Sequence, residues 1–139
     1  MARDTILVVD DDPDLRQMIG LYIGGTLGWR VLEADGVESA TDVLRVEIQR
    51  IAVIISDDRM GGYGRNGSDL FLQRSLDLHV HGIPFVLLSG TSEPQFLATA
   101  REFGMVPMQK PVRLNVLGAL LDTLISTMPL SIPPTPSEQ

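Results

Sequence analysis

ILVVDDDP (residues 6–13) is the stretch that decides the fold class. Four consecutive apolar residues are typical of a strand that is buried on both faces, as in a parallel sheet. Three aspartates follow directly, and Asp12-Pro13 offers a helix N-cap followed by proline at the first helical position. The stretch therefore predicts a buried strand that ends in acidic side chains and turns at once into a helix.

The same alternation of strand and helix continues along the chain. Apolar residues recur at helical spacing after Pro13, and a glycine pair ends the pattern (Leu15, Met18, Ile19, Tyr22; Gly24-Gly25). Further strands are predicted at residues 29–34, 51–56, 84–89 and 105–109, and further helices at 37–48, 68–78, 92–103 and 113–128. This order predicts an α/β fold with a doubly wound, five-stranded parallel sheet. Five units match the flavodoxin-like order 2-1-3-4-5, whose ligand crevice lies at the carboxyl ends of strands one and three.

Length and composition limit the function classes. The 139 residues suit one domain over residues 1–128, followed by a proline-rich tail or linker at 129–139. A net charge of −7 without a Lys/Arg cluster argues against direct binding to nucleic acid. The absence of cysteine excludes disulfides, thiolate metal sites and cysteine nucleophiles. With no long apolar run and no export leader, we expect no membrane span and a cytoplasmic protein.

Carboxylates gather where the crevice should lie. Asp10 and Asp11 follow the first strand, and Asp57 follows the third. Three negative groups so close would repel one another unless a cation neutralised them, and Mg²⁺ prefers such hard oxygen ligands. We therefore interpret this trio as a magnesium site. Asp12 and Asp58, beside it, are interpreted as cap or turn residues.

Two further polar residues end strands at the same edge of the sheet. Ser89 closes the fourth strand, and Gly90 leaves its hydroxyl free of a bulky neighbour. Lys110 follows the fifth strand and offers a point charge for a carboxylate or a phosphoryl oxygen. Either residue alone would be an ordinary cap or turn. Their common position with the aspartates indicates a site that handles an anion.

Four motifs in order give the chain a family resemblance: ILVVDDDPDLR (6–16), IISD (54–57), VLLSGT (86–91) and QKP (109–111). Over residues 4–127 the chain resembles the receiver domain of bacterial two-component response regulators. The resemblance implies that Asp57 is the phosphoryl acceptor, that Asp11 binds Mg²⁺ directly and Asp10 mostly through water, and that the backbone carbonyl of Arg59 is a further ligand. It also implies that Ser89 hydrogen-bonds the phosphoryl group and that Lys110 pairs with it. A cis peptide is expected before Pro111.

The function expected from the resemblance is signalling and not turnover of a substrate. A histidine kinase or histidine phosphotransfer protein would donate the phosphoryl group, and the domain would act only in its own phosphorylation and dephosphorylation. Two departures from the family stand out. The glycine-rich loop 61–67 is about two residues longer than usual, and Arg59 or Arg65 near it could reach the acidic site. Pro107 replaces the aromatic residue common at the switch position, so activation is expected to follow a different route.

Other interpretations remain open at this point. Asp10-x-Asp12 has the spacing of a haloacid-dehalogenase-like phosphatase, although the threonine expected after the second aspartate is missing. A degenerate receiver that acts as an interaction module without phosphorylation is another alternative. GYGRNG (62–67) spells a dinucleotide-binding pattern but starts too far from the strand end and lacks an acidic ribose partner. His79 and His81 have no third ligand nearby and are predicted to be loop residues.

The last predicted helix, residues 113–128, is unusually apolar. Leu114, Leu117, Leu121, Leu124 and Met128 form one stripe, whereas Val116 and Leu120 fall outside it. The excess predicts a second covered face and hence a homodimer or docking surface on this helix. Whether the chain is a stand-alone receiver or part of a larger regulator or kinase is left open by the sequence, as are its kinase and its output.

Overall fold

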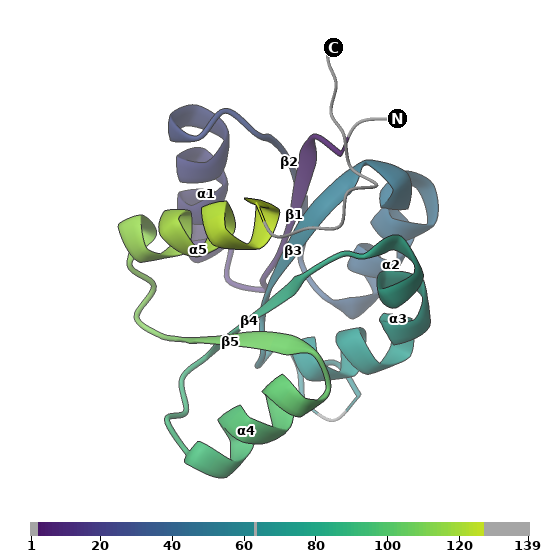
Figure 1. Ribbon diagram of the computed structural model, residues 1–139, viewed down its shortest axis with the longest axis vertical. Coiled ribbons are helices and arrows are strands. Elements are labelled where there is room, and N and C mark those ends of the chain that lie inside the picture. Colours follow the sequence, from purple (N-terminus) through teal and green to yellow (C-terminus); the bar gives the residue numbers. More distant parts are fainter. Residues whose placement is uncertain (1–2, 63, 127–139) are drawn as a thin grey trace.

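The computed structural model describes residues 3–62 and 64–126. Five parallel strands form one sheet in the order β2-β1-β3-β4-β5, which confirms the predicted flavodoxin-like fold (Figure 1). The strands are β1 (Thr5–Val9), β2 (Arg30–Ala34), β3 (Ile51–Asp57), β4 (Phe85–Ser89) and β5 (Met105–Gln109). The helices are α1 (Pro13–Leu21), α2 (Val37–Glu47), α3 (Gly67–His81), α4 (Pro94–Glu102) and α5 (Leu114–Ser126), with a π-helical turn at Tyr22–Thr26 and a 3₁₀ turn at Ile48–Arg50.

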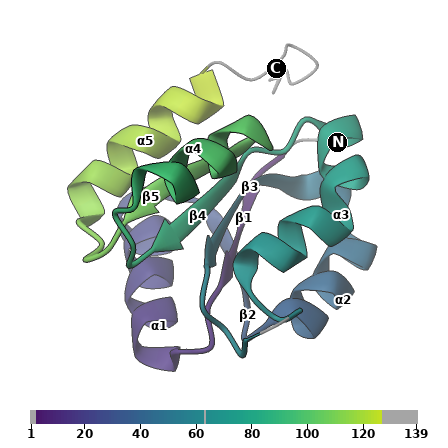
Figure 2. The same ribbon diagram turned by 90° about the horizontal axis from the view of Figure 1, so that it is seen from below.

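Helices cover both faces of the sheet, as the continuous apolar strands require. Figure 2 shows the strands between α1 and α5 on one side and α2 and α3 on the other. Residues of α4 join the apolar cluster of α2 and α3, whereas α1 and α5 share the opposite cluster. Every residue of β1 and β3 is buried. The two central strands are therefore held rigidly, and the residues that follow them are fixed in space.

The first helical segment runs further than the glycine pair predicted. After α1 the chain continues as a π-helical turn, in which the Leu27 N–H donates to the Tyr22 carbonyl over 3.1 Å. Gly24 does not end the helix but lies inside this turn, where a Cβ would make an ordinary contact 3.4 Å from the Val31 side chain. The left-handed residue that ends the segment is Gly28, with a φ of 83°.

The third helix also extends beyond its predicted end. α3 reaches His81, and Gly82 follows with a φ of 66°, the left-handed conformation typical of a helix C-cap. The prediction that His79 and His81 lie in a loop was therefore wrong, because both belong to the last turn of α3. Leu78, taken as the helix end, is a buried core residue in this turn.

The last helix is more fully packed than its sequence suggested. Leu120 does not fall away from the sheet but packs against the cluster that contains Leu117 and Leu121. Among the described residues of α5, Val116 is the one large apolar side chain that is exposed. The exposed apolar surface that motivated the predicted homodimer through α5 is therefore reduced to Val116 among the described residues. The dimer itself stays a prediction. Met128 and the predicted tail at 129–139 lie outside the described residues.

No helix within residues 3–62 and 64–126 has both the length and the apolar character needed to cross a membrane.

Candidate functional site

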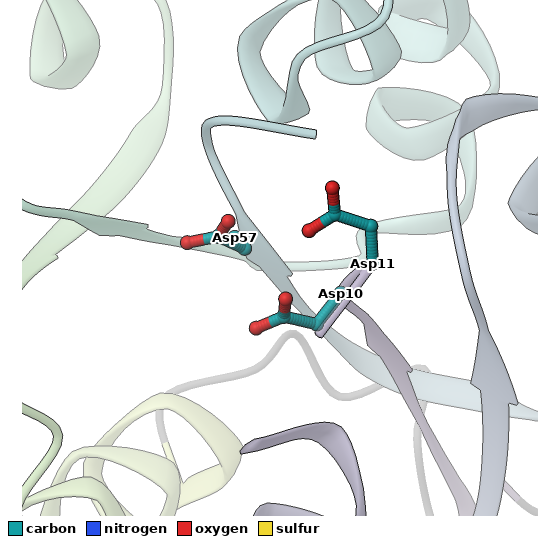
Figure 3. A group of neighbouring side chains, drawn as sticks. All are labelled: Asp10, Asp11 and Asp57. Atoms are coloured by element: carbon teal, nitrogen blue, oxygen red, sulfur yellow. The ribbon is translucent and has the colours of Figure 1, made fainter. Parts of the chain in front are cut away.

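Three carboxylates meet at the carboxyl ends of β1 and β3. The two strands pair in parallel, with Val9 opposite Ser56, so the residues that follow them are neighbours. One carboxylate oxygen from each of Asp10, Asp11 and Asp57 lies within 4.8 Å of the others. Figure 3 shows these side chains together, two from the end of β1 and one from the end of β3. The predicted acidic trio is thus brought together by the fold.

Local hydrogen bonds fix the turn that bears the first carboxylate. The Arg16 guanidinium donates to the Asp10 carbonyl over 2.7 Å and pairs with Glu33 at 2.9 Å. The Asp12 N–H donates to Asp10 Oδ1 over 2.9 Å. Asp12 itself accepts from the N–H of Asp14, which confirms it as the N-cap of α1. Arg16 was not among the residues predicted from the sequence, because its contact with the Asp10 backbone depends on the helix folding back along the strand.

The backbone of Asp57 is held from the other side by the start of α3. Asp58 accepts from the N–H and the hydroxyl of Ser68 over 3.2 and 3.1 Å, a structural role that agrees with its predicted turn function. The Gly67 N–H donates to the Asp58 carbonyl over 2.7 Å. A Cβ on Gly67 would lie only 2.3 Å from the Asp57 carbonyl oxygen and 2.8 Å from Ser56 Oγ. Gly67 is therefore a second residue of the site that was not predicted from the sequence.

Lys110 forms an ion pair with Asp57 through its Nζ and the Oδ1 atom. Its backbone N–H donates to the Ser89 carbonyl over 2.8 Å, which ties the ends of β4 and β5 together. The peptide bond before Pro111 is cis, as the resemblance implied. Ser89 is buried, and its Oγ accepts from the Thr91 N–H over 3.1 Å, which leaves the hydroxyl hydrogen available to donate.

Burial raises the pKa values of the two least exposed carboxyl groups. The pKa of Asp10 rises from 3.8 to about 6, mainly through loss of solvation, with a smaller contribution from the charges of Asp57 and Asp11. The pKa of Asp57 is also raised by burial, and the hydrogen bond and charge of Lys110 oppose this rise. Both carboxyl groups would be stabilised in their charged form by a further cation.

The geometry and the donor chemistry fit a divalent cation. Asp10 Oδ2 is buried without a hydrogen-bond partner, an arrangement that costs free energy unless another group fills its coordination. The oxygens of Asp11 and Asp57 lie beside it, and carboxylate oxygens are the ligands that Mg²⁺ prefers. Within the described ranges this is the one group of three or more acidic or histidine side chains with such spacing, so His79 and His81 find no third ligand there.

An open cleft of about 450 Å³ adjoins Asp57. Arg59, Thr91 and Lys110 line it, whereas Arg65 lines a different pocket beside the start of α2. Of the two arginines considered from the sequence, Arg59 is therefore the one placed at the site. Thr91 was missed, because it lies beyond the strand end on which the sequence pattern focused. A small anionic group can enter this cleft next to one lysine and one arginine.

The comparisons with known proteins agree on one family. The family model for the response regulator receiver domain matches residues 6–122. A response regulator receiver protein from Pseudomonas putida has a similar structure, with 30% identity and a TM-score of 0.75, covering 88% of this chain and 98% of that one. A receiver domain from Clostridium thermocellum matches with 23% identity and a TM-score of 0.75 over 91% and 95% of the two chains. No protein with curated annotation matches the sequence.

The chain belongs to the response regulator receiver domain family of two-component systems. A receiver domain is neither a haloacid-dehalogenase-like phosphatase nor a dinucleotide-binding domain. Membership in the receiver family therefore excludes both of these alternatives.

Proposed function

We propose that the domain accepts a phosphoryl group on Asp57 and passes this signal on through altered protein contacts. One observation supports this above the others: Asp57 is the carboxylate that is paired with Lys110 and also lines the open cleft. An oxygen of Asp57 attacks the phosphorus of a phosphohistidine on a kinase or phosphotransfer protein. The P–O bond forms as the P–N bond breaks, the electron pair returns to the imidazole, and the product is an acyl phosphate on Asp57.

Asp10, Asp11, Asp57 and the backbone carbonyl of Arg59 are proposed to hold the Mg²⁺ ion. When bound, Mg²⁺ supplies positive charge that neutralises the phosphoryl oxygens. Lys110, which is paired with Asp57, offers a second positive charge, and Ser89 would donate its hydroxyl hydrogen to the phosphoryl group. Burial of Asp10 excludes water from one side of the site, which strengthens each of these electrostatic contacts.

Propagation of the signal is proposed to differ from that in receivers with an aromatic switch residue. Pro107 lies in β5 opposite Leu87, three positions before Lys110. A proline is tolerated there because β5 is an edge strand. Its ring cannot rotate as a Phe or Tyr side chain does, so we propose that movement of Ser89 and Thr91 reaches the surface through the backbone of β4 and its loop.

Acetyl phosphate and Mg²⁺ test the assignment directly. We expect intact-mass measurement to show one added phosphoryl group on the wild-type protein and none on Asp57→Asn. Asp12→Asn is the matched control, because it makes the same chemical change at the exposed N-cap and should still be phosphorylated. An unmodified wild type would favour the alternative of a degenerate receiver, and a phosphorylated Asp57→Asn would refute the assignment.

Replacement of Lys110 separates its effect on Mg²⁺ binding from its effect on the rate of phosphorylation. In Lys110→Met we expect Mg²⁺ to bind about fivefold more tightly, because loss of a neighbouring positive charge removes on the order of 1 kcal/mol of repulsion. Phosphorylation by acetyl phosphate should nevertheless slow roughly 100-fold, because one charge that stabilises the transferring group is lost. Isothermal titration with Mg²⁺ and the rate of mass gain measure the two effects. Lys110→Arg, which keeps the charge, should retain the wild-type Mg²⁺ affinity; weaker Mg²⁺ binding in Lys110→Met would contradict the proposal.

A further inference from the structure

The glycine-rich loop between β3 and α3 is restrained by a side chain at its far end. Asn66 Oδ1 accepts from the Met60 N–H over 3.2 Å and from the Gly62 N–H over 3.3 Å. The Arg65 N–H in turn donates to the Gly62 carbonyl over 2.9 Å. Glycine has no side chain that could hold the backbone, and Gly61 and Gly62 adopt φ angles of 145° and 90°. The amide oxygen of Asn66 therefore restrains a segment that its glycines leave free.

Asn66 is itself anchored to the start of a helix. It directly precedes α3, and its own N–H donates to Asp69 Oδ2 over 2.9 Å. The next residue, Gly67, is buried, and its N–H donates to the Asp58 carbonyl over 2.7 Å. The start of α3 thus engages the backbone of Asn66, whereas the side-chain oxygen of Asn66 holds the loop.

The peptide group that Asn66 holds is the one that carries the Arg59 carbonyl. The C=O of Arg59 and the N–H of Met60 belong to the same peptide bond, and this bond is trans, since the cis bond among the described residues precedes Pro111. In a trans peptide bond the C=O and the N–H point in opposite directions. The hydrogen bond from Met60 to Asn66 therefore sets the direction of the Arg59 carbonyl, which points away from Asn66.

The residues on either side of this peptide group are fixed by other contacts. The Asp58 N–H donates to the Leu88 carbonyl over 2.9 Å, and the Met60 side chain is buried in the apolar cluster that α3 joins. Arg59 lies between them and is exposed. A peptide plane between two fixed residues can still rotate about its φ and ψ bonds. The contact with Asn66 removes this remaining freedom.

We propose that Asn66 is a positioning residue for the Mg²⁺ site, because it holds the Arg59 carbonyl in the orientation of a metal ligand. The inference rests on the proposed function, in which this carbonyl and three aspartates bind the ion. Arg59 lines the cleft beside Asp57. Mg²⁺ demands nearly ideal octahedral geometry, so a ligand that can turn away costs affinity. Asn66 is not a ligand and acts only through the peptide bond.

Calorimetric titration of the metal-free protein with Mg²⁺ tests the inference. We expect Asn66→Ala to bind Mg²⁺ about tenfold more weakly than the wild type, the usual loss when a partner that orients a ligand is removed. Asn66→Asp keeps an oxygen that can accept from both N–H groups and should bind at least as tightly as the wild type. Equal affinities for the wild type and Asn66→Ala, or an equal loss in both variants, would overturn the role of Asn66. A wild type that binds no Mg²⁺ would overturn the metal site itself.

A matched variant at the start of α2 separates loss of stability from loss of ligand orientation. Ser39 Oγ accepts from the N–H groups of Asp35 and Gly36 over 3.0 and 3.2 Å. Ser39→Ala therefore also removes one oxygen that accepts from two backbone N–H groups before a helix. We expect it to lower the thermal midpoint as Asn66→Ala does but to leave the Mg²⁺ affinity unchanged. If Ser39→Ala weakens Mg²⁺ binding as much as Asn66→Ala, the effect is one of stability and the inference is wrong.

Amide hydrogen exchange without metal tests the restraint independently of Mg²⁺ binding. In Asn66→Ala we expect the Met60 amide to exchange about tenfold faster than in the wild type, because its hydrogen bond is lost. Asn66→Asp should restore slow exchange at Met60. The Asp58 amide, which donates to the Leu88 carbonyl, is the internal control and should exchange at the wild-type rate in both variants. Unchanged exchange at Met60 in Asn66→Ala would show that Asn66 does not hold this peptide group, whatever the fate of the proposed phosphorylation.

Discussion

Gly67→Ala is expected to destabilise the domain by about 3 kcal/mol, at the upper end for an overpacked core. The added methyl group would lie 2.3 Å from the Asp57 carbonyl oxygen, 2.8 Å from Ser56 Oγ and 2.9 Å from the Leu87 side chain. The leucine can rotate away, but the carbonyl belongs to the central strand and cannot move without shifting Asp57. A fall in the thermal midpoint of roughly 10 °C follows from the expected change in free energy.

Gly67→Ala should also slow the phosphorylation of Asp57 by more than the loss of folding stability explains. Displacement of the Asp57 backbone separates its carboxylate from Lys110, so we expect phosphorylation by acetyl phosphate to slow at least tenfold at a temperature where the variant is fully folded. Thermal unfolding and intact-mass kinetics measure the two effects. Gly25→Ala is the control, because a Cβ there meets no atom within 4 Å. A Gly67→Ala protein with the stability and phosphorylation rate of the wild type would show that α3 does not restrain the acceptor strand.

Asp10 is expected to make the metal-free domain less stable as the pH rises. The pKa of Asp10 is about 6 in the folded state against 3.8 for an exposed carboxyl, so folding favours the protonated form. The stabilising effect is complete below pH 3.8 and is lost as the pH rises through about 6. Because Asp10 is almost fully buried, the loss amounts to about 3 kcal/mol for a shift of about two pH units. Burial also raises the pKa of Asp57, so this carboxyl group too makes the folded domain less stable as the pH rises.

Asp10→Asn should remove this dependence. In the presence of a chelator we expect the variant to be more stable than the wild type by about 2–3 kcal/mol at pH 7.5 and nearly equal to it at pH 4. Addition of Mg²⁺ should raise the thermal midpoint of the wild type at pH 7.5 and have little effect on the variant, since binding to the folded state stabilises it. Thermal scans over pH, with and without Mg²⁺, give the comparison. Asp12→Asn, at the exposed N-cap, should show the wild-type pH dependence and Mg²⁺ response. Equal pH profiles for wild type and Asp10→Asn would contradict this account.

Much of the site could be predicted because it depends on strand order alone. Continuous apolar runs define the strands, alternation with helices makes them parallel, and parallel strands deliver the residues after them to one edge. Asp10, Asp11, Asp57, Ser89 and Lys110 each follow or end such a run, so their meeting did not require knowledge of any side-chain contact. The N-cap role of Asp12 was equally local, since it depends on N–H groups only two and three residues away.

The tertiary structure decided which contacts form between residues that are distant in the sequence. Gly67 matters because α3 starts against the Asp57 carbonyl, and Arg16 matters because α1 folds back along β1; neither relation follows from residue spacing. The apolar surplus was assigned to α5 from its composition, yet Leu120 packs inward while Leu72, Leu76 and Val80 of α3 face outward. Both helices have apolar residues on more than one face, and periodicity alone does not distinguish the face turned to the sheet. Sequence by itself determined the fold and the acidic edge, because strand pattern is local; packing decided which glycine and which helix face matter, because those depend on neighbours distant in the chain.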